Sequence, residues 1–160
     1  MIDYAIRLYN GYGVPVNRDK SSQLLKKAAE SGDIEGMFHY GVNFLSLYYL
    51  KKAADNGHAE AMVQYGFILL KTGMHKEAAK YYKKAADLEN AKAMFNYGYM
   101  LFHGKGVDKN REEAATYFQL SADLGEIDGI YQYAYILQKG EGVGIDYEKS
   151  MKYYQKASFF

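Results

Sequence analysis

Histidine is the residue type in this sequence that could bind a metal ion or act as a general base. Metal-binding histidines on a helix stand three or four residues apart with carboxylate support, and no such pair is present. His58 lies beside an expected helix start and His103 next to a glycine turn. We therefore expect both to be exposed polar residues without a metal-binding or general-base role. The remaining histidines are His39 and His75.

A recurring glycine motif, Gly-x-Gly-Val, could be mistaken for a phosphate-binding loop. It begins at Gly11, Gly104 and Gly140. The third glycine of the dinucleotide fingerprint is missing, as are the preceding strand and a following Lys-Ser/Thr pair. The sequence contains no cysteine, which excludes a thiolate zinc site, a disulfide and a cysteine nucleophile. It also lacks a Ser-x-x-Lys motif, so no activated serine is indicated. We expect no catalytic residue, no cofactor and no metal.

Lysine doublets are the third group of residues with possible chemistry. They are Lys26-Lys27, Lys51-Lys52 and Lys83-Lys84. A stacked basic ridge could bind acidic segments or phosphate backbones. Alternatively, the lysines lie in the last turn of a helix, where cations offset the helix dipole, and the neighbours Glu30, Asp55 and Asp87 dilute their charge. We favour this second interpretation.

Composition limits the class of protein and of partner. The chain has 160 residues, of which 49% are apolar and 24% charged, and this balance indicates a folded protein. A net charge of +1 provides no overall attraction to nucleic acid or anionic lipid. The longest apolar runs are far shorter than the roughly 18 residues of a membrane helix, so we expect no membrane insertion. Without cysteine, sequon or signal pattern, we expect a cytoplasmic protein; the alternative is a secretory or lumenal one with a missing upstream signal.

An internal repeat organises the whole sequence. Similar segments begin at Lys26, Lys51, Lys83 and Gln119, at intervals of about 25 to 36 residues. Two apolar segments per repeat are typical of a helix-turn-helix solenoid. The oligomeric state stays open.

Each repeat is expected to form two antiparallel helices. In the repeat around Gly98, the first helix is predicted from about Ala91 to His103, because its apolar residues share one helical face. Gly98 lies mid-helix, as do Gly41 and Gly66, which indicates a partner helix too close for a side chain. The expected caps of the second helices are Asn17, Asn110 and Asp146, and their expected C-terminal glycines are Gly32, Gly57 and Gly125.

These motifs resemble the Sel-1-like repeats, relatives of the tetratricopeptide repeat. The matching pattern is A-x-x-x-Y-G-x-x-L-x-x-G-x-G-V followed by A-x-x-x-Y-x-x-A-A, seen best from Ala93 through Ala122. The resemblance implies an all-α, right-handed superhelical solenoid that serves as an adaptor for protein complexes. We expect one array of about five repeats, part of a longer array, at residues 1–31, 32–56, 57–88, 89–124 and 125–160. Glu89 and Ala134 depart from the pattern, because each stands where the other repeats have glycine.

The second repeat is too short for this pattern. Its first helix leads directly into its second at Leu45 and Ser46, although antiparallel helices need a connection of roughly 2 to 5 residues. Either residues 41–56 form one unbroken helix, or a loop between Leu45 and Ser46 is missing from the sequence. We favour the missing loop.

The first helices carry the candidate binding surface. Aromatic and amide side chains form rows opposite the core face, and in the resembled families this face lines a concave groove. We expect the groove to bind a protein or an extended peptide, with amides pairing to its backbone and rings packing its side chains. The predicted groove residues are Phe38, Phe67, Phe95, Tyr99, Tyr131, Tyr135, Gln64, Asn96 and Gln132.

Three functions are compatible with this sequence. A non-catalytic protein-binding scaffold is the function we favour. A second is a β-lactam-binding or β-lactam-hydrolysing enzyme, as linked to some cysteine-rich bacterial relatives; the absent cysteine separates this chain from them. The third is a structural spacer, in which the groove is filled by its own side chains. We expect about half of the groove residues to be exposed, Tyr99, Tyr131 and Tyr135 among them.

Overall fold

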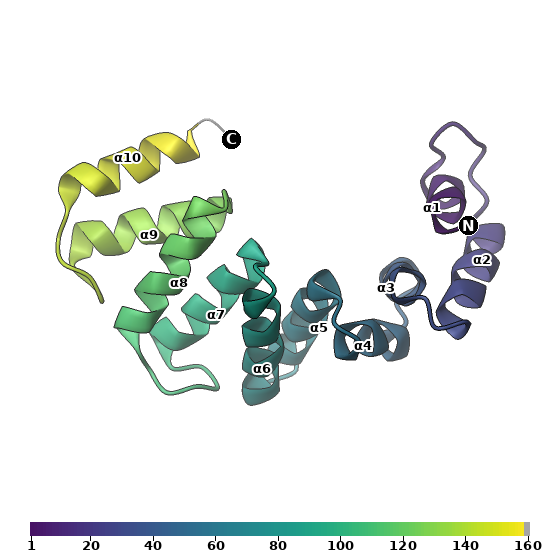
Figure 1. The fold of residues 1–160 in the computed structure, drawn as a ribbon, viewed down its shortest axis with the longest axis horizontal. Coiled ribbons are helices and arrows are strands. Elements are labelled where there is room, and N and C mark those ends of the chain that lie inside the picture. The colour runs from purple at the N-terminus through teal and green to yellow at the C-terminus, as the bar shows by residue number, and fades with distance from the viewer. Residues whose placement is uncertain (159–160) are drawn as a thin grey trace. The chain divides into compact units, whose positions relative to one another are not determined.

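The computed structural model describes residues 1–158. Within this range the chain forms ten α-helices and no strand, which confirms the predicted all-α class. The helices are α1 (Ile2–Asn10), α2 (Arg18–Glu30), α3 (Ile34–Asn43), α4 (Leu47–Asp55), α5 (Ala59–Lys71), α6 (His75–Asp87), α7 (Ala91–His103), α8 (Arg111–Asp123), α9 (Ile127–Lys139) and α10 (Tyr147–Ala157) (Figure 1). The last two residues of the predicted fifth repeat lie outside the described range.

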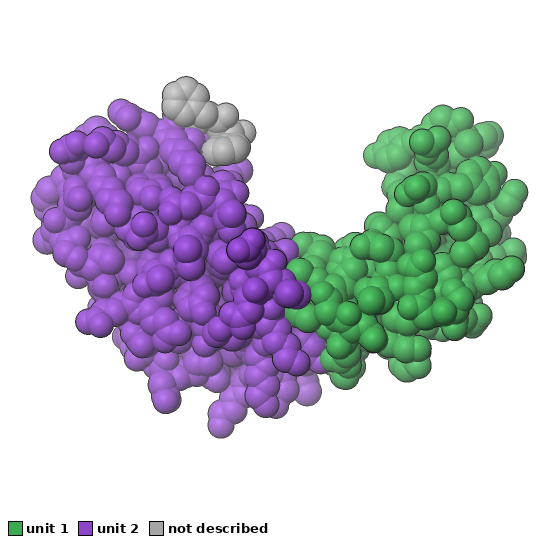
Figure 2. Space-filling view, in the orientation of Figure 1, with its two compact units in different colours: residues 1–65 green, residues 66–160 purple. Residues whose placement is uncertain are grey.

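The helices belong to two compact units, residues 1–65 and residues 66 onward (Figure 2). In the first unit α1 packs on α2, α2 on α3 and α3 on α4. In the second unit each helix from α6 to α10 packs on the next. The first helices of successive pairs also touch, α1 with α3 and α7 with α9. Packing of each helix on its chain neighbours is the arrangement of a helical solenoid.

Side-chain caps begin the second helices where the sequence predicts them. The side chains of Asn17, Asn110 and Asp146 each accept a hydrogen bond from a backbone N–H three residues later, at 2.9, 3.1 and 2.8 Å. The preceding turn is closed in the same way each time; the Asn110 N–H, for example, donates to the Leu101 carbonyl at 3.0 Å. The Gly-x-Gly-Val motif is therefore a turn between paired helices.

Mid-helix glycines allow the paired helices to approach closely. A β-carbon on Gly98 would lie 3.0 Å from the Phe118 ring, and one on Gly66 would lie 2.9 Å from the Tyr82 ring. At Gly41 it would lie 2.7 Å from a backbone nitrogen of α4. These distances confirm the close partner predicted from the repeated glycine.

Alanine replaces the mid-helix glycine in two repeats, at Ala5 and Ala134, and in both repeats the facing helix carries a serine. The Ser21 hydroxyl donates to the Ala5 carbonyl at 2.7 Å, and the Ser150 hydroxyl donates to the Ala134 carbonyl at 2.8 Å. Both serines are buried. Ala134, which departs from the family pattern, is thus accommodated by a buried side-chain hydrogen bond from the partner helix.

The second repeat forms neither of the two arrangements considered for it, one unbroken helix or two helices that need a missing loop. Helix α3 ends at Asn43 and α4 begins at Leu47, so residues 41–56 are not one helix. No missing loop is required either, because residues 44–46 reverse the chain. Leu45 makes this possible by adopting a left-handed backbone conformation, with φ of 54°. Three residues are enough when the middle one takes this conformation.

Candidate functional site

Two of the predicted groove residues lie one turn apart on α7. Phe95 and Tyr99 are half-buried, with their ring centroids 6.5 Å apart. The Phe95 ring also lies 5.9 Å from the ring of the fully buried Phe118. The α7 side of the surface is therefore fixed by contact with the core of the second unit.

Tyr99 is bordered by two residues that are not among the predicted groove residues, His103 and Lys105. Its ring centroid lies 4.3 Å from that of His103, and the Lys105 Nζ lies 5.1 Å from the Tyr99 centroid. Desolvation lowers the pKa of His103, and the nearby lysines lower it further. His103 is exposed, as predicted. Lys105 is the variable residue of the motif Gly-Lys-Gly-Val, in the turn directly after α7. This position in the sequence could have indicated that Lys105 lies near Tyr99.

Two more predicted aromatic residues lie one turn apart on α9. Tyr131 is 50% exposed and Tyr135 is 41% exposed. The Tyr131 ring lies 6.2 Å from the ring of Tyr154 on α10. Because α7 and α9 are in contact, these two tyrosines and the α7 pair are carried by neighbouring helices. The fold thus leaves large aromatic side chains accessible on one pair of first helices.

The amide side chains differ in their availability. Asn96 and Gln132 are half-buried, and their amide groups make no hydrogen bond to another residue within residues 1–158. The Gln64 amide, in contrast, donates to Glu60 at 3.2 Å within α5. An amide offers both a donor and an acceptor, so Asn96 and Gln132 are suited to pair with a peptide backbone.

The predicted residues of the first unit are engaged internally. Phe38 is stacked on His58, with ring centroids 4.2 Å apart and an interplanar angle of 23°. His58 Nδ1 accepts a hydrogen bond from the Ala61 N–H at 3.1 Å, while its Nε2 lies 3.2 Å from a Glu35 carboxylate oxygen. The prediction that His58 is exposed is wrong: its side chain is only 12% exposed. It caps α5 and packs against residues about twenty positions earlier, which local sequence does not reveal.

Phe67 is the remaining predicted residue, on the part of α5 that belongs to the second unit. It is 51% exposed, and the Lys71 Nζ lies 5.3 Å from its ring centroid. A lysine next to the ring is a feature that Phe67 shares with Tyr99, although Tyr99 is less exposed. Of the nine predicted residues, three are exposed, Phe67, Tyr131 and Tyr135, which is fewer than the expected half. The expectation that Tyr99 is exposed is wrong: it is half-buried, because its ring packs beside those of Phe95 and His103.

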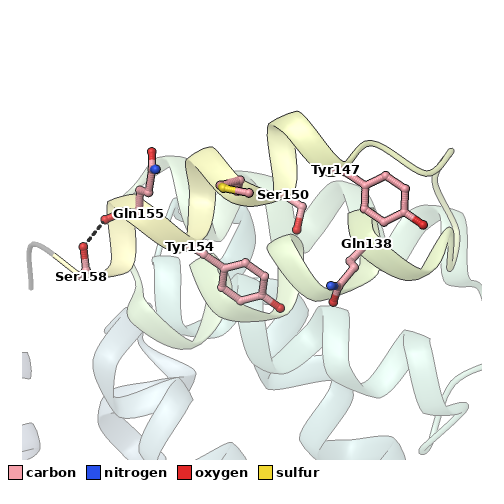
Figure 3. Close-up of a pocket in the computed structure, with 7 residues that line it drawn as sticks. Gln138, Tyr147, Ser150, Tyr154, Gln155 and Ser158 are labelled. Carbon is pink, nitrogen blue, oxygen red and sulfur yellow. Dashed lines mark hydrogen bonds between the residues drawn. The ribbon is translucent and has the colours of Figure 1, made fainter.

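A separate open hollow lies along α10, and Figure 3 shows the side chains around it. Tyr147, Tyr154 and Gln155 come from α10 and Gln138 from α9. Tyr154 stands at the repeat position of Phe118, which is buried between α8 and its neighbours. This face of α10 therefore has the residue pattern that a solenoid helix uses for packing.

The described part of the chain holds no cluster of three histidine or acidic residues that could bind a metal ion. None of its helices combines the length and the apolar character needed to cross a bilayer.

Comparison with known proteins identifies the class of this fold and then the family. No curated protein matches the chain. A protective antigen of uropathogenic Escherichia coli strains displaying an SLR fold is 26% identical with a TM-score of 0.92, covering 98% of this chain and 37% of that one. A Sel1 repeat protein from Oxalobacter formigenes is 23% identical with a TM-score of 0.91, covering 99% of this chain and 71% of that one. Cysteine rich protein B from Helicobacter pylori is 23% identical with a TM-score of 0.54, covering 86% of this chain and 89% of that one.

The fold is thus the helical solenoid of tandem short repeats. The Sel1 repeat family matches residues 1–33, 37–58, 59–90, 91–126 and 127–158. The chain therefore belongs to the Sel1 repeat family, which confirms the resemblance found in the sequence. It spans little more than a third of the length of the E. coli antigen.

Proposed function

We propose that this chain is a non-catalytic scaffold that binds an extended peptide segment of a partner protein. The proposed site is the face of α7 and α9 that carries Phe95, Tyr99, Tyr131 and Tyr135. The observation that supports it best is the exposure of Tyr131 and Tyr135 on a helix in contact with α7. Repeat solenoids of this class commonly use such surfaces for protein interaction.

The chemistry of the face suits a peptide. Tyrosine buries a large area while fixing only two side-chain torsions, so it loses little conformational entropy on binding. Asn96 and Gln132 stand between the ring rows of their helices and supply backbone-pairing groups. Phe67 is proposed to extend this surface. Phe38 and Gln64 lie in the other unit and already make internal contacts, so the proposal rests on the second unit alone.

A peptide-display selection against the whole chain, followed by affinity measurement, tests this proposal. Aromatic anchors at the centre of an interface commonly contribute 2 kcal/mol or more each, as a rough figure. We expect Tyr99→Ala combined with Tyr135→Ala to weaken binding of the selected peptides at least about tenfold, with an unchanged helical circular dichroism spectrum.

Two control variants make the test specific. Tyr12 and Tyr48 are each 67% exposed in the first unit, so Tyr12→Ala combined with Tyr48→Ala removes the same chemistry elsewhere. Charge reversal at Lys83 and Lys84 should have a much smaller effect, since exposed charges act mainly through screened steering. If either control weakens binding as much as the Tyr99 and Tyr135 pair, the proposed site is wrong.

A further inference from the structure

An open hollow of about 430 Å³ lies between α6 and the turn that joins α7 to α8. It belongs entirely to the second unit. Its lining residues are Lys76, Ala79, Lys80, Lys83, Lys84, Tyr97, Gly106 and Val107. Four of these eight residues are lysines and none is acidic, in a chain whose net charge is only +1.

The floor of this hollow is apolar and firmly held. Ala79 is buried, and Tyr97 and Val107 pack against the core of the unit. The Tyr97 ring makes an edge contact with Tyr117, with centroids 4.9 Å apart. Gly106 lies so close to α6 that a β-carbon would be 2.4 Å from the His75 carbonyl. The turn and the helix thus hold the floor in one arrangement.

The lysines around the floor are not equivalent. Lys83 is paired with Asp87, as the dipole interpretation of the lysine doublets predicts. Lys76, Lys80 and Lys84 have no carboxylate within ion-pair distance in the part of the chain described. Their four-residue spacing places them along one face of α6, at intervals of about 6 Å. Three cations therefore border an apolar floor without acidic partners.

The repeat architecture does not require these lysines. The corresponding positions of α8 hold Glu112, Thr116 and Leu120, and α8 forms a helix of the same length, 13 residues, with the equivalent face buried. A helix of this fold is therefore stable without a lysine row. The row on α6 is a property of this surface and not of solenoid packing.

We infer that this hollow is a second interaction surface, which binds an acidic peptide segment with one apolar side chain flanked by carboxylates. The apolar side chain would contact Tyr97 and Val107, and the carboxylates would pair with Lys76, Lys80 and Lys84. Alternate side chains of an extended peptide are about 6.6 Å apart, close to the lysine spacing. A nucleic-acid backbone offers phosphates but no apolar group for the floor, so a peptide fits better. This surface is separate from the tyrosine face of α7 and α9.

Fluorescence anisotropy with a labelled acidic heptapeptide tests the inference. The probe has leucine at its centre and Glu or Asp at the other six positions. Each exposed ion pair changes an affinity by a factor of roughly 1.5 to 5. We expect Lys76→Gln, Lys80→Gln and Lys84→Gln combined to weaken binding at least about threefold, and higher salt to weaken binding to the wild type.

A matched variant controls for net charge. Lys20→Gln, Lys26→Gln and Lys27→Gln on α2 remove the same charge from the other unit and should change the affinity less than about twofold. The variant with Tyr99→Ala and Tyr135→Ala should also bind the acidic probe like the wild type. The result of this test therefore does not depend on whether the proposed peptide site on α7 and α9 is correct. Circular dichroism confirms that each variant is folded.

The probe itself is varied to test the two parts of the surface. Replacing its acidic residues with Gln and Asn should abolish binding, and replacing its central leucine with glycine should weaken it at least about threefold. The inference is overturned if the α6 variant binds like the wild type or if either altered peptide binds like the original. Tighter binding of a thymidine oligonucleotide than of the peptide would also overturn it, in favour of a phosphate site.

Discussion

Leu45 and Glu89 are the non-glycine residues with positive φ in the described range, at 54° and 59°. A β-carbon in this conformation costs roughly 1 to 2 kcal/mol because it crowds the following carbonyl oxygen. Glu89 stands where Gly32 and Gly125 end other second helices, with φ of 92° and 88°. The turn at Glu89 thus keeps the positive φ of the other repeats, although its residue is not glycine.

Glu89→Gly should therefore stabilise the protein. Glycine removes the crowding but adds freedom to the unfolded chain, so we expect a net gain of about 0.5 to 1 kcal/mol in the free energy of unfolding. Urea denaturation measures it. Glu112→Gly is the matched control, because Glu112 lies within α8, where glycine should lower stability by up to about 1 kcal/mol. A loss of stability in Glu89→Gly would contradict the argument.

Tyr82 gives a prediction for alkaline pH. Burial raises the pKa of its phenol to about 12, from an ordinary value of 10.0. Between these values the unfolded chain releases the proton and the folded chain keeps it, so stability falls as pH rises through this window. The free energy of unfolding of Tyr82→Phe should fall less steeply than that of the wild type between pH 10 and 12. Equal slopes in chemical denaturation would show that the phenol does not remain protonated in the folded state.

At the scale of helices, the close contact between α5 and α6 leaves no room for a larger side chain at Gly66. Gly66 faces the ring of Tyr82, which is 1% exposed and has little room to move. Gly66→Leu should overpack this contact and lower the free energy of unfolding by about 1 to 3 kcal/mol or more. Thr116→Leu, on the exposed face of α8, is the control and should change stability by less than about 0.5 kcal/mol. Similar denaturation midpoints for the two variants would refute the predicted close packing.

At the scale of the whole molecule, contacts between chain neighbours should confine the effect of damage. Each helix from α6 to α10 packs mainly on the helices next to it in sequence. In Gly66→Leu we therefore expect amide hydrogen exchange to accelerate across residues 59–86, with α9 and α10 as the internal control. Uniform acceleration along the chain, or none in residues 59–86, would contradict this nearest-neighbour behaviour.

The sequence by itself determined the repeat, the order of the helices and most of their ends. Most of these features depend on residues within a few positions of one another; Asn110, for example, caps a helix through an N–H three residues away. Family membership follows from the same local patterns. The candidate aromatic residues were also identified from sequence, because their helical spacing places them opposite the core face.

Only the tertiary structure decided which of those side chains are available. Phe38 and Tyr131 occupy the same row, but His58 stacks on Phe38 while Tyr131 remains half exposed. The three-residue turn at Leu45 and the lysine-bordered hollow on α6 were likewise not apparent in the sequence. Exposure and pairing depend on atoms contributed by segments that are distant in sequence, and a helical pattern specifies the direction of a side chain but not the neighbour that meets it.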